Sequence, residues 1–314
     1  MGRYIVRRLL ATVVVLWLVT LISFSIMHLV PGDPAVVMAG VGASADQVQR
    51  IREQFGLDAP FVARLSRWYG DLLRGNLGDS ILLGRTVAQA IAERIPATLS
   101  LAALAFGLTV VFGVVLGTIA AVRQNTWVDQ VVMALAVVGV SVPNFWLGLL
   151  LIILFSVMLD WLPAGGYVPF AEDPWAWFRA LVLPAVSLAL LQVGLVVRIT
   201  RATVVETLRQ DFVRTARAKG LAGWVIVGKH AFGNVTIPVI TVLGITVSLL
   251  LSGSVVVETV FSVPGLGRLM ATAILARDYP VIQGGLLVTA LLFAGINLVV
   301  DVLYAWLDPR IRYR

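Results

Sequence analysis

The residues Gly223 to His230 read GWVIVGKH, which nearly matches G-x-x-x-x-G-K-[ST], the loop that cradles nucleotide phosphates. In that loop the backbone wraps the phosphates, the lysine reaches them, and the final hydroxyl ligates magnesium. Here His230 offers no hydroxyl, and the bulky Trp224 and Val225 stand where the backbone should wrap phosphate. The sequence therefore predicts no nucleotide site in this stretch, so any ATP is bound by another chain.

The other stretches that resemble catalytic or ligand-binding motifs are also incomplete. The sequence PGLGR, Pro264 to Arg268, lacks a βαβ setting and predicts a turn, not a dinucleotide loop. The histidines His28 and His230 are far apart, H-E-x-x-H and G-x-S-x-G do not occur, and cysteine is absent. The acids Glu258 and Asp301 fall near the ends of separate apolar segments. We therefore expect no catalytic, cofactor-binding or metal-binding residue and no enzyme activity.

Composition places the chain in a membrane. Hydrophobic residues make up 59% and charged residues 13% of the 314 positions, whereas soluble domains carry about 25% charged residues. The apolar runs are long and continuous, as in spanning helices, and lack the short alternating pattern of a barrel. The net charge of +7 fits basic cytoplasmic loops better than nucleic-acid binding. The predicted fold class is an all-α polytopic membrane protein.

Six segments have the length that a membrane span requires. They lie near residues 9–30, 97–121, 130–159, 180–199, 237–257 and 284–307. The third is expected to break or kink around Pro143. The first is longer than a typical signal core and is interpreted as a retained span. The chain then divides into a tail and first span (1–30), an insert (31–95) and a membrane domain with the remaining five spans (96–314).

Basic residues in short loops predict the orientation. One set of flanks holds fourteen of them: Arg3, Arg7, Arg8, Arg123, Arg198, Arg201, Arg209, Arg214, Arg217, Lys219, Lys229, Arg310, Arg312 and Arg314. The opposite short loops hold three: Arg179, Arg268 and Arg277. Both termini are therefore expected in the cytoplasm.

The insert 31–95 has a more soluble character, with seven acids and seven bases. Ser44 and Gln47 have capping-box spacing, which predicts a short helix ending at Gly56. A second helix is expected from Phe61 to Leu73, before RGNLGDS breaks it. We expect an extracytoplasmic helical cap, with a solvated loop that has no partner as the alternative.

In the second span, Gly113 and Gly117 have G-x-x-x-G spacing. Such pairs let two helix backbones approach closely. The sequence leaves open whether this contact lies within the chain or between subunits.

A basic, amphipathic connection joins the fourth and fifth spans. Placed on one helix, Val204, Leu208 and Phe212 form an apolar face. Gly220 is the expected helix stop, and Thr236 is expected to cap the fifth span. Two interpretations remain at this point: a helix that rests on anionic lipid headgroups, or a helix that docks to a cytoplasmic partner.

Within this connection Arg214 to Leu221 reads RTARAKGL, and Pro238 follows Gly220 by eighteen residues. This arrangement resembles the cytoplasmic signature loop of inner-membrane permease subunits of ATP-binding-cassette (ABC) importers, in the dipeptide/oligopeptide/nickel branch. Arg214 and Thr215 replace the Glu-Ala of the wider importer family. Four further stretches are similar to that branch: LVPGDPA (29–35), GNLGDS (75–80), ETVFSVPGLG (258–267) and DVLYAWLDPRIR (301–312).

The resemblance implies a type I ABC importer permease in a bacterial inner membrane. Its implied partners are a second homologous permease, two ATPase subunits or one fused ATPase that bind ATP and Mg, an extracytoplasmic binding protein and membrane lipid, with no nucleic acid. The segment 200–236 becomes the coupling loop. The implied coupling residues are Arg214, Thr215, Ala216, Arg217, Ala218, Lys219, Gly220 and Leu221.

Substrate identity is not encoded in any motif. Di- and oligopeptides are the default within the resembled family, with glutathione, a nickel chelate or a sugar as alternatives. An ATP-independent channel or carrier is the hypothesis from another class. Candidates for the translocation path lie on the fifth span: Thr241, Thr246, Ser248 and Ser252.

Overall fold

The computed structural model describes residues 2–29, 34–40, 42–54, 58–80 and 82–307, and these are predominantly helical. The chain divides into two compact units. The core unit comprises Ala97–Pro264 and the chain from Ile296, and the flanking unit comprises Gly2–Pro96 and Gly265–Gly295. The expected helix end at Gly56, residues 30–33 of LVPGDPA and the arginines after residue 307 lie outside the described residues.

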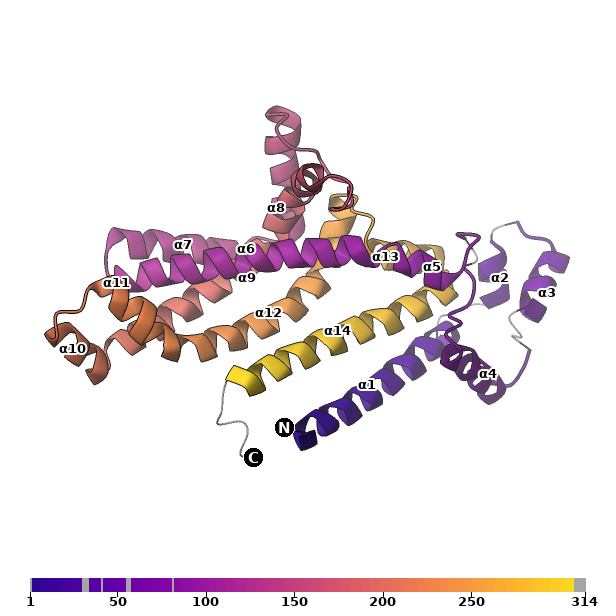
Figure 1. Ribbon diagram of the computed structural model, residues 1–314. Helices are drawn as coiled ribbons and strands as arrows, with labels where there is room; N and C mark the ends of the chain where they lie inside the picture. Colours follow the sequence, from indigo (N-terminus) through magenta and orange to yellow (C-terminus); the bar gives the residue numbers. More distant parts are fainter. Residues whose placement is uncertain (1, 30–33, 41, 55–57, 81, 308–314) are drawn as a thin grey trace. The chain divides into compact units, whose positions relative to one another are not determined.

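The core unit is built around one central helix. It contains α6 (Ile95–Val122), α7 (Trp127–Ser141), α8 (Asn144–Leu151), the π-helix η1 (Ile152–Met158), α9 (Pro174–Leu208) and α12 (Phe232–Val260). Helix α9 packs against α7, α8 and α12 (Figure 1). Its buried leucines meet those of α6 and α12, with Leu101, Leu188 and Leu250 almost inaccessible to solvent. Burial of these apolar side chains explains why α9 is the most enclosed of the long helices.

The predicted break at Pro143 is confirmed, and it is sharper than a kink. Helix α7 ends at Ser141, Val142 is extended, and α8 begins after Pro143. The proline lacks an N–H and forces the residue before it out of helical conformation. The helices on either side meet at 105°. The described residues thus contain five helices long and apolar enough to span a membrane, and a sixth if the bent pair is one span.

The other five predicted spans are found as long helices, with boundaries that differ from the expected ones. They are α1 (Gly2–Leu29), α6, α9, α12 and α14 (Tyr279–Leu307). The largest difference is at α9, which continues nine residues beyond the expected end at position 199. Packing of Val204 and Thr207, both buried, stabilises this extension after the membrane-length apolar run has ended.

The glycine pair of α6 makes a contact within the chain. A Cβ on Gly113 would lie 2.6 Å from Val196 Cγ1, and one on Gly117 would lie 2.8 Å from the Val197 carbonyl oxygen. Both partners belong to α9. The two glycines therefore let α6 and α9 approach at backbone distance, as the G-x-x-x-G pattern allows.

The flanking unit contains α1, α2 (Pro34–Ala39), α3 (Ala45–Gln54), α4 (Phe61–Leu73), α5 (Val87–Ala92), α13 (Leu266–Ala276) and the first part of α14. The predicted capping box is confirmed. The Ser44 N–H donates to Gln47 Oε1 at 2.9 Å, and the Gln47 N–H donates to Ser44 Oγ at 3.3 Å. Helix α4 has the predicted bounds.

Helix α4 is attached to α1 through aromatic rings. The Phe24 ring lies 5.5 Å from Phe61 and 5.4 Å from Trp68, measured between centroids. The hydroxyls of Thr20 and Tyr69 are 3.0 Å apart. Such ring pairs add about 0.5–1.5 kcal/mol each beyond their buried area, so the contact holds the insert on the first span.

The segment after α4 packs onto the start of α14. After α4 ends at Leu73, Gly75 and Gly78 adopt positive φ. The Ser80 hydroxyl then donates to Asp278 Oδ2 at 2.5 Å, and Asp278 also accepts from the Val281 N–H at 3.4 Å. Asp278 is buried. One carboxylate thus caps α14 and fixes the segment at Ser80.

Candidate coupling helix

Helix α10 (Asp211–Ala218) follows α9 closely and is succeeded by α11 (Gly223–Val225) and the π-helix η2 (Ile226–Ala231). These elements lie together at the end of the core unit where α6 and α9 terminate (Figure 1). The stretch Gly223–His230 is thus mostly helical and does not form a phosphate-wrapping loop. The side chain of His230 lies outside the described part of the chain.

The expectation of one continuous helix through this connection is wrong. Helix α9 ends at Leu208, and Gln210 adopts an extended backbone with ψ of 153° before α10 begins. The break resets the helical phase. Val204 is buried as predicted, whereas Phe212 is 38% exposed and Val213 takes the buried position.

One face of α10 is seated on the chain's own π-helix. Val213 and Ala216 are buried, and with Leu208 they pack against Ile226 of η2. Their spacing of three residues places both on one side of the helix. The apolar face is therefore covered by other residues of the same chain, and a partner would have to contact another face of α10.

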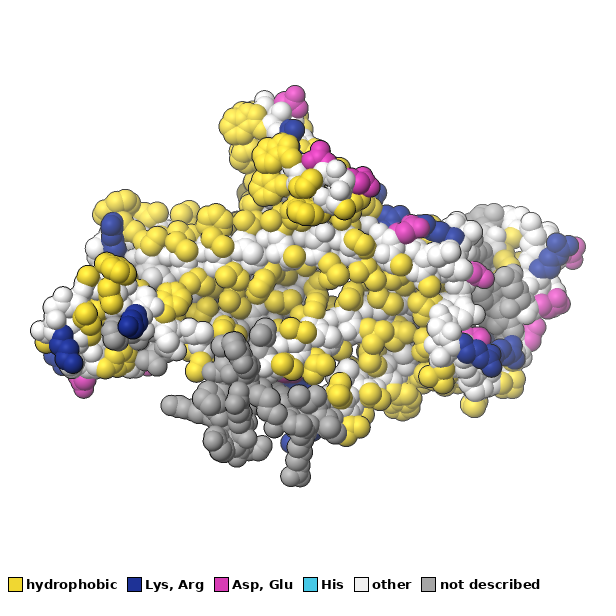
Figure 2. Space-filling view, viewed as in Figure 1, with side chains coloured by type: hydrophobic (Ala, Val, Ile, Leu, Met, Phe, Trp, Pro, Cys, Tyr) yellow, Lys and Arg dark blue, Asp and Glu magenta, His cyan; other side chains and the backbone are white. Residues whose placement is uncertain are grey.

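The opposite face of α10 is basic and open. Arg214, Arg217 and Lys219 are exposed. Arg214 lies 3.5 Å from Asp211, but both side chains are largely in solvent, and such pairs contribute little to stability. Figure 2 shows Lys and Arg side chains at this end of the core unit, next to the hydrophobic surface of the spans. Helix α10 therefore presents positive charge on its exposed face, while its apolar face packs against η2.

The helix stop predicted at Gly220 is confirmed, and its geometry is a Schellman motif. The Leu221 N–H donates to the Ala216 carbonyl at 3.3 Å, and the Gly220 N–H donates to the Arg217 carbonyl at 2.9 Å. Gly220 has φ of +76°, and a Cβ there would meet nothing within 4 Å. A glycine is favoured because of its backbone conformation and not because of crowding within the chain.

The expectation that Thr236 caps the fifth span is wrong. Helix α12 begins at Phe232, directly after η2, and Thr236 lies inside it with its hydroxyl donating to the Phe232 carbonyl at 2.5 Å. Pro238 is also inside α12. Because the preceding π-helix runs into α12 without an extended residue, the chain needs no new cap at this point.

Three of the four path candidates lie on one side of α12. Thr241 and Ser252 are exposed, and half-buried Ser248 donates to Asn297 Oδ1 of α14 at 3.1 Å. Their spacing of seven and four residues keeps them on one helical face. Thr246 is 1% exposed, so the structure does not bring it to that face.

Sequence reasoning missed one buried ion pair close to the coupling helix. Arg201 of α9 donates through Nε to Asp129 Oδ1 at 2.5 Å and through Nη2 to Oδ2 at 2.6 Å. The Asn125 N–H adds a bond to Oδ2 at 2.9 Å. Asp129 is 3% exposed. The sequence predicts Arg201 only as one of the basic residues of the cytoplasmic flanks. The available signal was a single acid, Asp129, at the start of one apolar segment and the arginines Arg198 and Arg201 late in another.

Comparison with known proteins identifies the family. The binding-protein-dependent transport system inner membrane component matches residues 113–313, and its N-terminal counterpart matches residues 1–102. A Brucella abortus (strain 2308) protein named as a peptide transport system permease is 49% identical over the full length of both chains. The glutathione transport system permease protein GsiC of Escherichia coli (strain K12) is 43% identical, also over both full lengths.

A solved structure shares the fold. An inward-facing MetNI methionine ABC transporter matches with a TM-score of 0.60 and 17% identity, covering 70% of this chain and 97% of that one. The chain belongs to the family of binding-protein-dependent transport system inner membrane components.

Proposed function

We propose that this chain is the permease subunit of an ABC importer for small peptides, and that α10 couples it to an ATPase. The observation that carries the proposal is the two-sided environment of α10. Its apolar face is fixed by Ile226, and its basic face is open to a partner. The chain itself hydrolyses no ATP in this proposal, since ATP and Mg are bound by two ATPase subunits or one fused ATPase.

The packing suggests how force on α10 reaches the membrane spans. A push on α10 acts on η2 through Val213 and Ala216, and η2 continues directly into α12. It also acts on α9, from which α10 is separated only by Arg209 and Gln210. Since α9 packs against α7, α8 and α12, the displacement is shared among the helices of the core unit.

Substitutions at Gly220 test the coupling role. Asp and Asn both tolerate a positive φ better than other side chains, so the two variants differ mainly in charge. Gly220→Asp places a carboxylate next to the basic face, and we expect transport and coupled ATPase activity to fall on the order of tenfold. Gly220→Asn, the matched control, should retain most activity. Wild-type transport by an assembled Gly220→Asp complex would remove this helix from the mechanism.

The exposed face of α12 is proposed to line the translocation path together with a second, homologous permease. Thr241, Ser248 and Ser252 supply hydroxyls there, whereas buried Thr246 is left out of the path. Because the chain has no cysteine, Ser252→Cys can be labelled alone. Substrate should slow labelling at position 252 and not at Thr272→Cys in α13. Equal labelling rates with and without substrate would exclude this face.

The insert 31–95 is proposed to lie outside the cytoplasm and to receive a binding protein. Val62 and Leu73 of α4 are 74% and 87% exposed, which suits a docking surface. Deletion of residues 44–73 should abolish uptake in the presence of the binding protein. Val62→Glu with Leu73→Glu should do the same without disturbing the fold. Normal uptake by the folded double variant would refute the proposal.

The relatives suggest the substrate class and the location. Peptides are the proposed substrates, and glutathione, itself a small peptide, fits the same class. A nickel chelate or a sugar is the alternative. We place the chain in a bacterial inner membrane with both termini in the cytoplasm. Uptake of a labelled dipeptide, with and without excess glutathione, tests the class. Competition is expected, and uptake of neither compound would contradict a peptide importer.

A further inference from the structure

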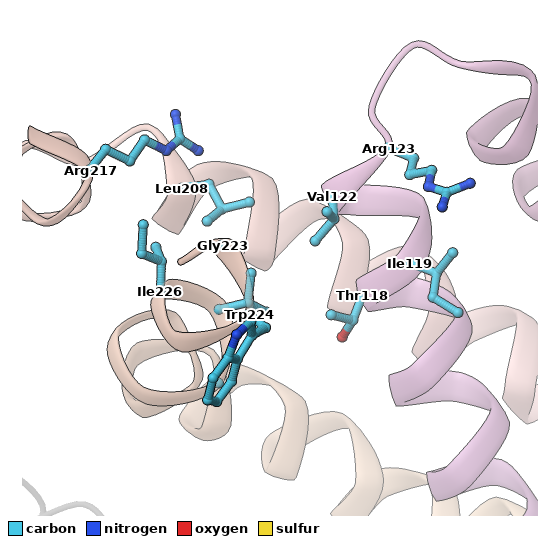
Figure 3. A pocket seen from close by; sticks show the side chains of 11 residues that line it. Thr118, Ile119, Val122, Arg123, Leu208, Arg217, Gly223, Trp224 and Ile226 are labelled. Carbon is cyan, nitrogen blue, oxygen red and sulfur yellow. The ribbon is translucent and has the colours of Figure 1, made fainter. Parts of the chain in front are cut away.

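An open pocket lies beside the coupling helix. It has a volume of about 700 Å³, within the range of ~300–1,000 Å³ typical of ligand sites. Figure 3 shows one wall from α6, with Thr118, Ile119 and Val122, and the other from the connection after α10, with Trp224 and Ile226. The walls are chiefly apolar.

The pocket lies at the level of the lipid headgroups. Helix α6 contains 28 residues without a charged side chain and ends at Val122, directly before Arg123. At 1.5 Å per residue this run is about 42 Å long, the full thickness of a bilayer with its interfaces. Trp224 is 80% exposed, as is common for tryptophans in the interfacial belt.

Two arginines line the same pocket. Arg123 comes from the end of α6 and Arg217 from α10, and Figure 3 shows them at opposite sides of the pocket. Among the described residues neither guanidinium forms an ion pair, and the pocket lining contains no acid. The site therefore combines two positive charges with an apolar cleft.

We infer that this pocket binds an anionic phospholipid, with the headgroup attracted by the positive charge of Arg123 and Arg217 at the pocket and an acyl chain along the apolar walls. Basic pockets on the cytoplasmic side of membrane helices recognise anionic headgroups by this combination. The inference rests on the orientation proposed above. A water-soluble ATPase is a poorer occupant, because Ile119 and Val122 are exposed apolar residues of a membrane span. The bound lipid would then contact the coupling helix through Arg217.

The test uses the assembled transporter and native mass spectrometry with added phosphatidylglycerol or phosphatidylcholine. Arg123→Gln should weaken phosphatidylglycerol binding about fivefold, the effect expected of one arginine at a membrane surface. Ile119→Trp fills the pocket without changing charge and should also reduce binding. Arg209→Gln is the matched control, because Arg209 is exposed and outside the pocket. Arg217 is left intact because it belongs to the coupling stretch.

Each outcome decides the inference. Selective loss of phosphatidylglycerol in Arg123→Gln and Ile119→Trp, with Arg209→Gln unchanged, supports it. Wild-type binding in both pocket variants, or equal loss of both lipids, overturns it. Recovery of the ATPase is measured on the same samples. If Arg123→Gln loses the ATPase, the pocket is a protein interface and the lipid site is wrong. If wild type itself retains no ATPase, the proposed coupling function fails separately.

Discussion

Arg201 holds Asp129 through two parallel hydrogen bonds and thereby joins α9 to the first turn of α7. The pair lies about two turns before the end of α9, from which the chain leads into α10. The same helix that leads to the coupling element is thus fixed to the bent span. A displacement of α10 is expected to move α7 together with α9.

Removing one partner should destabilise the core unit strongly. Arg201→Met leaves the buried Asp129 carboxylate without its cation, which costs about 3–5 kcal/mol in comparable buried pairs. The measurement is thermal unfolding of the purified complex, with the exposed Arg209→Met as the control. Arg201→Met combined with Asp129→Leu should recover part of the loss. A double variant no more stable than Arg201→Met would show that the pair does not act as a unit.

Because α6 packs closely on α9, alanine substitutions at two glycines of α6 should differ in how much stability they cost. Gly117→Ala would press its methyl group against the Val197 carbonyl and Thr200, and overpacking costs about 1–3 kcal/mol. Gly107→Ala is the matched control, because nothing lies within 4 Å of a Cβ there. Thermal stability should fall for the first variant only. Equal stability of both would mean that α6 and α9 do not approach as described.

The hydroxyl of Ser80 supports the buried carboxylate that caps α14. Ser80→Ala should cost about 1–3 kcal/mol, the penalty for a buried acceptor that loses its partner. The exposed Ser66→Ala in α4 serves as the control. The readout is the thermal stability of the full-length chain in its complex. If the two serine variants unfold at the same temperature, Asp278 is satisfied in some other way.

Local signals predicted much of the fold. The capping box at Ser44, the bounds of Phe61–Leu73, the break at Pro143 and the stop at Gly220 all follow from short-range rules of backbone geometry. These rules depend on residues within about one turn. For the same reason the helix stop after RTARAKGL could be predicted, whereas the break before it at Gln210 was not predicted.

Contacts between distant segments could not be predicted in this way. The extension of α9 to Leu208 depends on packing of Val204 and Thr207, and the burial of Val213 depends on where the backbone breaks. The ion pair of Asp129 and Arg201 joins positions 72 residues apart. No periodicity in the chain encodes such a pair, so the anchoring of the coupling element became visible only in three dimensions.

The most direct test of the account is the identity of the neighbour of α10. The chain contains no cysteine, so Ala218→Cys, on the exposed side of α10, provides a unique cross-linking site in this chain. In membranes that contain the assembled transporter, a reagent with a thiol-reactive maleimide and a photoactivated benzophenone, which inserts into nearby C–H bonds, should join position 218 to the ATPase. The same reagent on Val62→Cys in α4 should give no cross-link to the ATPase. A cross-link from position 62 to the ATPase, or none from position 218, would contradict the account.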